Sequence, residues 1–302
     1  MQQTFSLLPA SHRWNRLVQT HLTKTHDPTQ SFQEKLSQIR GHLEHAKKAG
    51  CRPENGLRVL EFGTGVSPIV PIGLFLSGAA IVYTVDPVPL VTPEDVRQVL
   101  RLFLDHEADE GLDSMLPSLQ RQRVGALTEA LQTPRHLSAK ELLASLDIRY
   151  GVVDGRATGL PDSSIDLFVS NNVLEHIPQE SIRGVFREAR RLAAPCAVMS
   201  HFIDMTDHYA HSNSSIGMYN FLKYRPWVWR FANNSLQYQN RLQASDYAKL
   251  FEESGWEIVI QEQTRGRVEE LPHGELAPEF RRYNIDDLLT KNAWIACRLA
   301  SG

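Results

Sequence analysis

Short apolar runs recur along this chain of 302 residues, and segments with helical spacing separate most of them. Runs of five to eight residues have the length of buried strands, and several end at a glycine or an aspartate. Seven runs are predicted strands: residues 58–62, 80–85, 148–153, 165–170, 196–203, 257–261 and 293–299. Because strands that alternate with helices form βαβ units, we expect an α/β fold. Its sheet is predicted to be doubly wound and mostly parallel, with an antiparallel last strand and helical insertions.

The segments between the strands suggest how the chain is divided. Residues 1–55 are predicted to form an N-terminal helical arm, with a helix over residues 32–49, and residues 56–302 the α/β domain. Connecting loops around a single helix usually have about 2–6 residues, so residues 88–147 are predicted to be a helical insertion. Ser67 and Ser245 are placed to cap the helices that follow them.

The composition argues against several classes of partner. Lys and Arg number 32 against 35 Asp and Glu, a net charge of −3, so we expect no nucleic-acid partner. The longest apolar stretch, residues 66–85, is broken by prolines and glycines, and no stable membrane insertion is expected. Three widely spaced cysteines and a polar start without the order of a signal peptide favour the cytoplasm.

The first predicted strand ends at a glycine-rich turn, Gly63-Thr64-Gly65. Glycine lets the backbone approach a ligand where a Cβ atom would clash. Asp86 follows Gly65 by 21 residues, close to the spacing of about 20 at which an acid meets ribose hydroxyls in dinucleotide folds. Alone, such a turn can also be a plain connection between a strand and a helix.

Two residues close to this turn help to distinguish between nucleotide cofactors. The nicotinamide fingerprint needs glycine or alanine at its sixth position, where this chain has Pro68. Glu61 lies two residues before the first glycine, and its carboxylate could hold a cationic amino group. That pattern suits the methionine part of S-adenosylmethionine better than it suits NAD.

From about residue 57 to 200 the chain resembles the class I S-adenosylmethionine-dependent methyltransferases, in particular the type 11 group, which have a Rossmann-like fold. The resemblance lies in VLEFGTG, TVDP and GVVDGRATGLPDSSIDLFVSNNVLEHI. It implies that the methionine moiety lies against Glu61, Gly63 and Gly65, that Asp86 binds the ribose and that Asp154 binds the adenine amino group. The full set of implied cofactor contacts is Glu61, Gly63, Thr64, Gly65, Asp86, Asp154, Gly155 and Asn171. The chain departs from the family at Ser67, where a third glycine is frequent.

The acceptor is expected beyond the fifth strand, because ligands of open α/β sheets bind outside the carboxyl ends of the strands. Residues 201–211 (HFIDMTDHYAH) follow there. A hydroxyl acceptor must lose its proton, so His208 is the first candidate base, with Asp207 or Asp204 to orient it, and His211 is the second. These side chains could also hold a metal ion, but magnesium prefers oxygen ligands and no metal site is expected. His176 could touch the cofactor edge or simply pack.

The residues therefore predict an enzyme that moves a methyl group from S-adenosylmethionine to oxygen, with nitrogen second, of a small metabolite or glycan. Residues 204–245 would form the acceptor or lid segment, within which Asn240 and Arg241 could position a polar acceptor. The aromatic run 219–231 within it could pack on the sheet, cover the acceptor, or contact a membrane or a second copy, so a homodimer stays open. The alternatives are a non-catalytic docking protein of the same fold and an NAD-dependent sugar-nucleotide enzyme.

Overall fold

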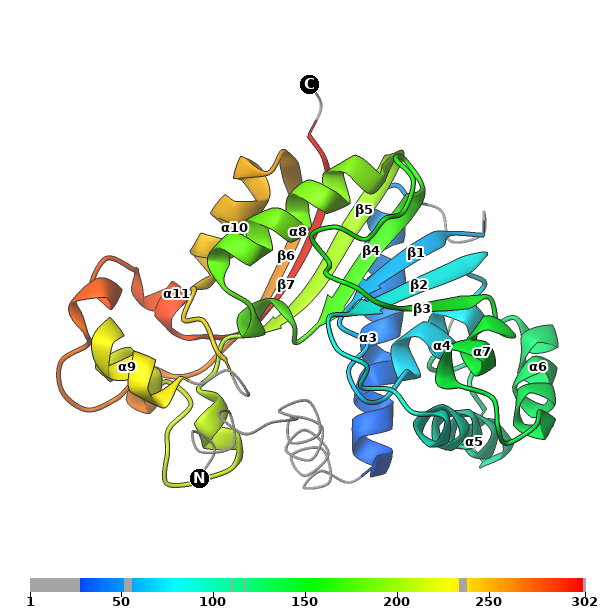
Figure 1. Ribbon diagram of the computed structural model, residues 1–302. Coiled ribbons are helices and arrows are strands. Elements are labelled where there is room, and N and C mark those ends of the chain that lie inside the picture. Colours follow the sequence, from blue (N-terminus) through cyan, green and yellow to red (C-terminus); the bar gives the residue numbers. More distant parts are fainter. Residues whose placement is uncertain (1–27, 52–55, 110, 117, 234–237, 301–302) are drawn as a thin grey trace.

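The computed structural model describes residues 28–51, 56–109, 111–116, 118–233 and 238–300. Its seven-stranded sheet has the order β3-β2-β1-β4-β5-β7-β6 (Figure 1). Strands β1 to β5 pair in parallel, and β7 is antiparallel to both of its neighbours. The predicted α/β fold, with a mostly parallel sheet and an antiparallel last strand, is confirmed.

All seven predicted strands form, and four of them, β4 to β7, are longer than the sequence indicated. The strands are β1 (Arg58–Phe62), β2 (Ile81–Asp86), β3 (Ile148–Val152), β4 (Ile165–Asn171), β5 (Ala193–Asp204), β6 (Trp256–Arg265) and β7 (Thr290–Leu299). The α-helices are α3 (Pro28–Lys48), α4 (Ile69–Leu76), α5 (Pro93–Asp109), α6 (Arg121–Gln132), α7 (Ala139–Ala144), α8 (Gln179–Leu192), α9 (Pro226–Ala232), α10 (Ala244–Glu253) and α11 (Ile285–Leu288). The part of the chain that the structure describes also has five short 3-10 helices: η2 (Leu174–His176), η3 (His208–His211), η4 (Asn220–Lys223), η5 (Val268–Glu270) and η6 (Pro278–Phe280).

Helices cover both faces of the sheet, and each face has its own hydrophobic core. Helices α3 and α4 pack on one face, where every residue of α4 is buried. A Cβ atom at Gly73 would lie 2.3 Å from Ile39 Cδ1, so this glycine lets α3 and α4 approach closely. Helices α8 and α10 pack on the other face, and α8 buries side chains three and four residues apart (Figure 1).

Three helices, α5 to α7, lie between β2 and β3, where the sequence has its long helical segment. Buried residues of all three join the core that α3 and α4 form, so they extend one face of the sheet. Residues 219–231 form a third core with residues 271–289, a segment for which the sequence indicated no structure. Trp229 is buried there, whereas Trp227 and Phe231 are 63 % and 71 % exposed.

Both predicted helix caps are wrong. Pro68 takes the N-cap position of α4 and makes no side-chain cap bond, because that helix begins two residues after Ser67. Helix α10 begins at Ala244, and Gln243 and Asp246 form its capping box; Ser245 instead bonds the Asp287 carboxylate. Within the described ranges, no helix has the length and apolar character needed to cross a bilayer. Residues 1–27 of the predicted N-terminal arm lie outside the described residues.

Candidate cofactor and acceptor site

The glycine-rich turn lies at the carboxyl end of β1, between β2 and β4 in the sheet. Gly63 and Gly65 have φ angles of +81° and +65°, a region that side chains with a Cβ atom rarely adopt. A Cβ atom at Gly63 would also lie 2.4 Å from Val173 Cγ2, so the turn packs against the residues that follow β4. Both glycines that the sequence singled out are therefore required by the backbone.

Glu61 is buried at the end of β1 with only 3 % of its surface exposed. The Thr84 hydroxyl donates to Glu61 Oε2 at 2.5 Å, so the same oxygen of Thr84 accepts from Thr64 at 2.5 Å. Burial raises the pKa of the Glu61 carboxyl to about 8. A cation entering this site would stabilise the ionised form of Glu61.

Asp86 ends β2 beside the turn, and its carboxylate already organises the backbone there. It accepts from the backbone N–H groups of Gly65, at 3.2 Å, and Val88, at 3.3 Å. Burial raises its pKa, and these two bonds oppose the shift. Two carboxylate oxygens still have lone pairs for ribose hydroxyls, as the predicted role of Asp86 requires.

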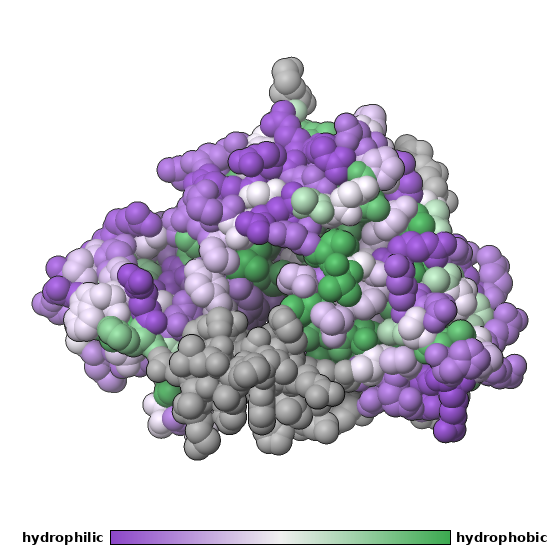
Figure 2. All heavy atoms as spheres, viewed as in Figure 1, coloured by the Kyte–Doolittle hydropathy of each residue, from purple (hydrophilic) through white to green (hydrophobic). Residues whose placement is uncertain are grey.

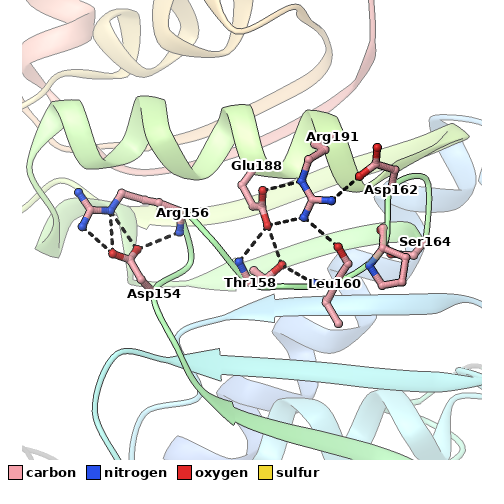
Figure 3. Close-up of polar contacts among 9 residues, drawn as sticks. Asp154, Arg156, Thr158, Leu160, Asp162, Ser164, Glu188 and Arg191 are labelled. Atoms are coloured by element: carbon pink, nitrogen blue, oxygen red, sulfur yellow. Dashed lines mark hydrogen bonds and ion pairs between the residues drawn. The ribbon is translucent and has the colours of Figure 1, made fainter.

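Asp154 lies in the loop after β3 and is bound by a residue of its own loop (Figure 3). The Arg156 guanidinium forms an ion pair with it and keeps the pKa of the Asp154 carboxyl below its usual value. The same figure shows Arg191 of α8 joining Glu188, Asp162 and the Leu160 carbonyl, which ties α8 to the rest of this loop. An adenine amino group would therefore donate to Asp154 oxygens that already accept hydrogen bonds from Arg156.

Gly155 and Asn171 complete the predicted cofactor contacts. A Cβ atom at Gly155 would approach Phe62 Cδ1 to 3.2 Å, so the loop lies close to the end of β1. Asn171 ends β4, where its Oδ1 atom is 3.0 Å from His42 Nε2 of α3. The predicted cofactor residues thus surround the carboxyl ends of β1 to β4.

A second cluster lies at the carboxyl end of β5, where the acceptor was expected. His211 Nε2 is 3.2 Å from Asp204 Oδ2. The His211 side chain is 37 % exposed, so it is less buried than His208. The hydrogen bond to Asp204 raises the pKa of His211. His208 Nε2 lies 3.7 Å from the same oxygen, but burial lowers its pKa to about 4. His211 therefore has the stronger basicity of the two candidates.

Asp207 stabilises the loop after β5 instead of orienting a histidine. It caps η3 by accepting from Tyr209 N at 2.9 Å, and it also accepts from Asn220 Nδ2 at 3.1 Å. The carboxylate beside both histidines is Asp204, the alternative that the sequence left open. Asn240 and Arg241 are likewise engaged inside the protein, with the carbonyl oxygens of the η2 and η4 regions.

Sequence reasoning did not single out Glu175 as part of this cluster. Glu175 Oε1 accepts from Asp204 N at 3.2 Å, and Oε2 has no hydrogen-bond partner among the described residues. His176 donates from Nδ1 to the Tyr238 carbonyl at 2.9 Å, and its ring centroid is 4.7 Å from that of His208. In the sequence, Glu175 stands out only as part of the Leu-Glu-His-Ile segment, one of the segments that carry the family resemblance.

Ligand atoms of Asp204, His208 and His211 lie within 4.8 Å of one another, as do those of Glu175, His176 and His208. Such groups could hold a metal ion. Asp204 is already satisfied without one, because its Oδ1 accepts from Thr206 N and Oγ1, and its Oδ2 faces His211. Without a metal ion, His211 and Asp204 form a hydrogen-bonded pair of base and carboxylate.

The family model for the methyltransferase domain matches residues 30–261. The chain belongs to this family. This confirms the predicted class of enzyme, a methyltransferase that uses S-adenosylmethionine. No curated protein matches the chain.

Solved structures of three methyltransferases are among those similar to it. One is the 1,6-didemethyltoxoflavin-N1-methyltransferase of Burkholderia thailandensis, at 14 % identity over 97 % of this chain and 92 % of that one, TM-score 0.48. Another is a putative sarcosine dimethylglycine methyltransferase of Galdieria sulphuraria, at 14 % identity over 87 % and 85 %, TM-score 0.46. The third is the magnesium protoporphyrin IX methyltransferase of Synechocystis PCC 6803, at 13 % identity over 89 % and 83 %, TM-score 0.46.

Binding of the cofactor product S-adenosylhomocysteine is expected to release a proton from Glu61. Burial raises the pKa of Glu61 to about 8 in the free protein, while Thr84 and Lys35 lower it. The cationic amino group of the ligand stabilises the carboxylate, so the pKa falls on binding. Affinity should therefore rise with pH up to about 8 and then level off. Calorimetry at pH 7 in two buffers of different ionisation enthalpy measures the release, which Glu61→Gln should abolish; equal release in that variant would assign the proton to another group.

Proposed function

We propose that this methyltransferase transfers the methyl group to a hydroxyl oxygen of a small polar metabolite or a glycan-type acceptor. The observation that supports it is the hydrogen bond between His211 and Asp204 at the carboxyl end of β5. A hydroxyl group is a poor nucleophile until its proton is removed, and a histidine whose pKa is raised by a carboxylate suits that task. A neutral amine would need no such base at the moment of attack.

In this proposal the protein contributes mainly alignment. The cofactor supplies the reactive methyl group, and methyl transfer needs the nucleophile in line with the bond that breaks. Asp204 holds the His211 ring from β5, and His211 accepts the hydroxyl proton through its other ring nitrogen. Figure 2 shows apolar side chains gathered near the centre of the face that carries α8 and the region of α5 to α7.

The proposal is tested by supplying cofactor with a carbon-13 methyl group together with separate sets of sugars, phenols, hydroxy acids and amines. Carbon NMR separates O-methyl from N-methyl products because the two carbons resonate in different ranges. An O-methyl product that is absent with Asp86→Ala supports the proposed function. Products confined to the amines would contradict it.

Turnover is expected to survive removal of metal ions. Since Asp204 already has hydrogen-bond donors at both oxygens, the His211 base needs no ion to hold its carboxylate. Dialysis against a chelator, followed by the same carbon NMR assay, should leave the rate within about twofold, the spread expected for a change well under 1 kcal/mol. A loss that zinc or manganese restores would make the cluster a metal site instead.

A further inference from the structure

His42 is a fully buried histidine on α3, a helix outside the glycine-rich motif. Its Nδ1 atom lies 2.8 Å from Ser200 Oγ of β5, and its Nε2 atom lies 3.0 Å from Asn171 Oδ1 of β4. Burial lowers the pKa of His42 to about 3, so the ring is neutral and carries one N–H group. Which nitrogen carries that proton follows from the next residue in the network.

Trp294 fixes the direction of these hydrogen bonds. Its indole N–H donates to Ser200 Oγ at 2.9 Å, and an indole nitrogen can only donate. Ser200 is fully buried, and among the described residues His42 Nδ1 is the only acceptor within reach of its hydroxyl proton. Ser200 therefore donates to His42 Nδ1, so the ring proton is on Nε2 and is donated to Asn171 Oδ1.

The consequence is a fixed amide at Asn171. With Oδ1 held by His42, the NH2 group points the other way, and Nδ2 is buried without a hydrogen-bond partner among the described residues. A buried donor left unsatisfied costs about 1–3 kcal/mol, which a ligand oxygen would relieve. Asn171 ends β4, and Val173, two residues later, packs on Gly63, so the strand end that carries this amide adjoins the glycine-rich turn proposed for the methionine moiety.

Lys35 brings a positive charge to the same place. It precedes His42 by seven residues, so both lie on one face of α3. Burial lowers the pKa of its ammonium group, and the negative charges of Glu61 and Glu175 oppose that shift. None of the ion pairs among the described residues includes Lys35. Figure 1 shows that α3 runs past the sheet, with its first turns beyond the carboxyl ends of the strands.

We propose that α3 builds the site for the α-carboxylate of the cofactor: Asn171, oriented by His42, and Lys35 donate hydrogen bonds to it. His42 is a positioning residue that acts through Asn171. This inference rests on the cofactor site described above, with Glu61 facing the amino group of the same zwitterion.

The test is calorimetry on the full chain with two ligands, S-adenosylhomocysteine and 5′-methylthioadenosine, which lacks the amino-acid end. Asn171→Asp replaces the free donor by an acceptor, so it should weaken S-adenosylhomocysteine binding by about 10- to 100-fold. Lys35→Met should have an effect in the same range. Methylthioadenosine affinity should change by less than about threefold in both variants, since it makes neither contact.

His42 is tested by two substitutions. His42→Phe frees the Asn171 amide to rotate and should weaken S-adenosylhomocysteine alone by about 10-fold, whereas His42→Gln keeps one acceptor and one donor and should restore most of the affinity. His45→Gln, one turn further along α3 and against Trp294, is the control for effects on the helix. Thermal unfolding checks that each variant folds.

The outcomes separate this inference from the cofactor site itself. If the unaltered protein binds neither ligand, the cofactor site is wrong. If it binds both, and Asn171→Asp binds S-adenosylhomocysteine as tightly as before or more tightly, Asn171 presents an acceptor and the inference is overturned. Equal losses for both ligands would also overturn it, because the contact would then lie with adenosine.

Discussion

Replacing Asp86 by alanine is expected to weaken S-adenosylhomocysteine binding by at least about 100-fold. Hydrogen bonds that involve a charged group contribute about 1.5–3 kcal/mol each, and the Asp86 carboxylate offers two to the ribose hydroxyls. Together they amount to at least ~3 kcal/mol, which corresponds to a factor of 100 or more in the dissociation constant. Calorimetry with the purified variant measures the change directly.

Asp86 also holds the turn, so the experiment needs a second variant. Alanine leaves the Gly65 and Val88 N–H groups without their acceptor and should lower the unfolding temperature. Asp86→Asn keeps one acceptor oxygen for the turn, yet should still lose most of the affinity. Asp105→Asn on α5, at an exposed position, is the matched control and should bind as the unaltered protein does. Unchanged affinity in both Asp86 variants would place the ribose elsewhere.

Most of the sheet could be predicted because each strand is specified locally. The strands of this fold are short apolar runs, and their alternation with helices defines the mostly parallel order. The third core could not be predicted in the same way. Residues 271–289 have weak periodicity, and they are ordered by Phe221 and Trp229, which lie tens of residues earlier in the chain.

The positions of the predicted cofactor residues could be inferred where those residues directly follow a strand. Gly63, Asp86, Asp154 and Asn171 all lie at or just after a strand end, and parallel strands bring those ends to one edge. His42 and Lys35 had no such signal, since they lie on a helix whose apolar spacing was the visible feature. The role proposed for His42 depends on contacts with residues that lie 129 and 158 positions later in the chain.

Which histidine is the candidate base also depends on contacts that the sequence does not show. A sequence places two histidines and two aspartates within eight residues, but it does not say which ring meets which carboxylate or how far each is buried. The structure pairs Asp204 with His211 and buries His208, and burial disfavours the protonated ring. The preference therefore moves from His208 to His211, and from Asp207 to Asp204.

Replacing His211 by alanine is expected to lower turnover by about 10²- to 10⁴-fold. The affinity for S-adenosylhomocysteine should stay within about twofold, because a positioned base contributes to the reaction step and not to cofactor binding. The acceptor that the carbon NMR assay identifies supplies the substrate for this measurement. His208→Ala should cost much less, since a ring with a pKa of about 4 is a weak base. His136→Ala, on an exposed loop, controls for the loss of a histidine as such.

The pH dependence of the rate separates a base from a residue that only shapes the site. The working form of His211 is neutral, and Asp204 raises its pKa, so the rate should fall as the pH drops through a value above 6.5. In Asp204→Asn that support is gone: the maximal rate should fall and the acid limb should move to lower pH, because the imidazole loses its partner. An Asp204→Asn profile that keeps the same acid limb would mean that the titrating group is not His211. If His208→Ala alone abolished turnover, the buried histidine would be the base in spite of its low pKa.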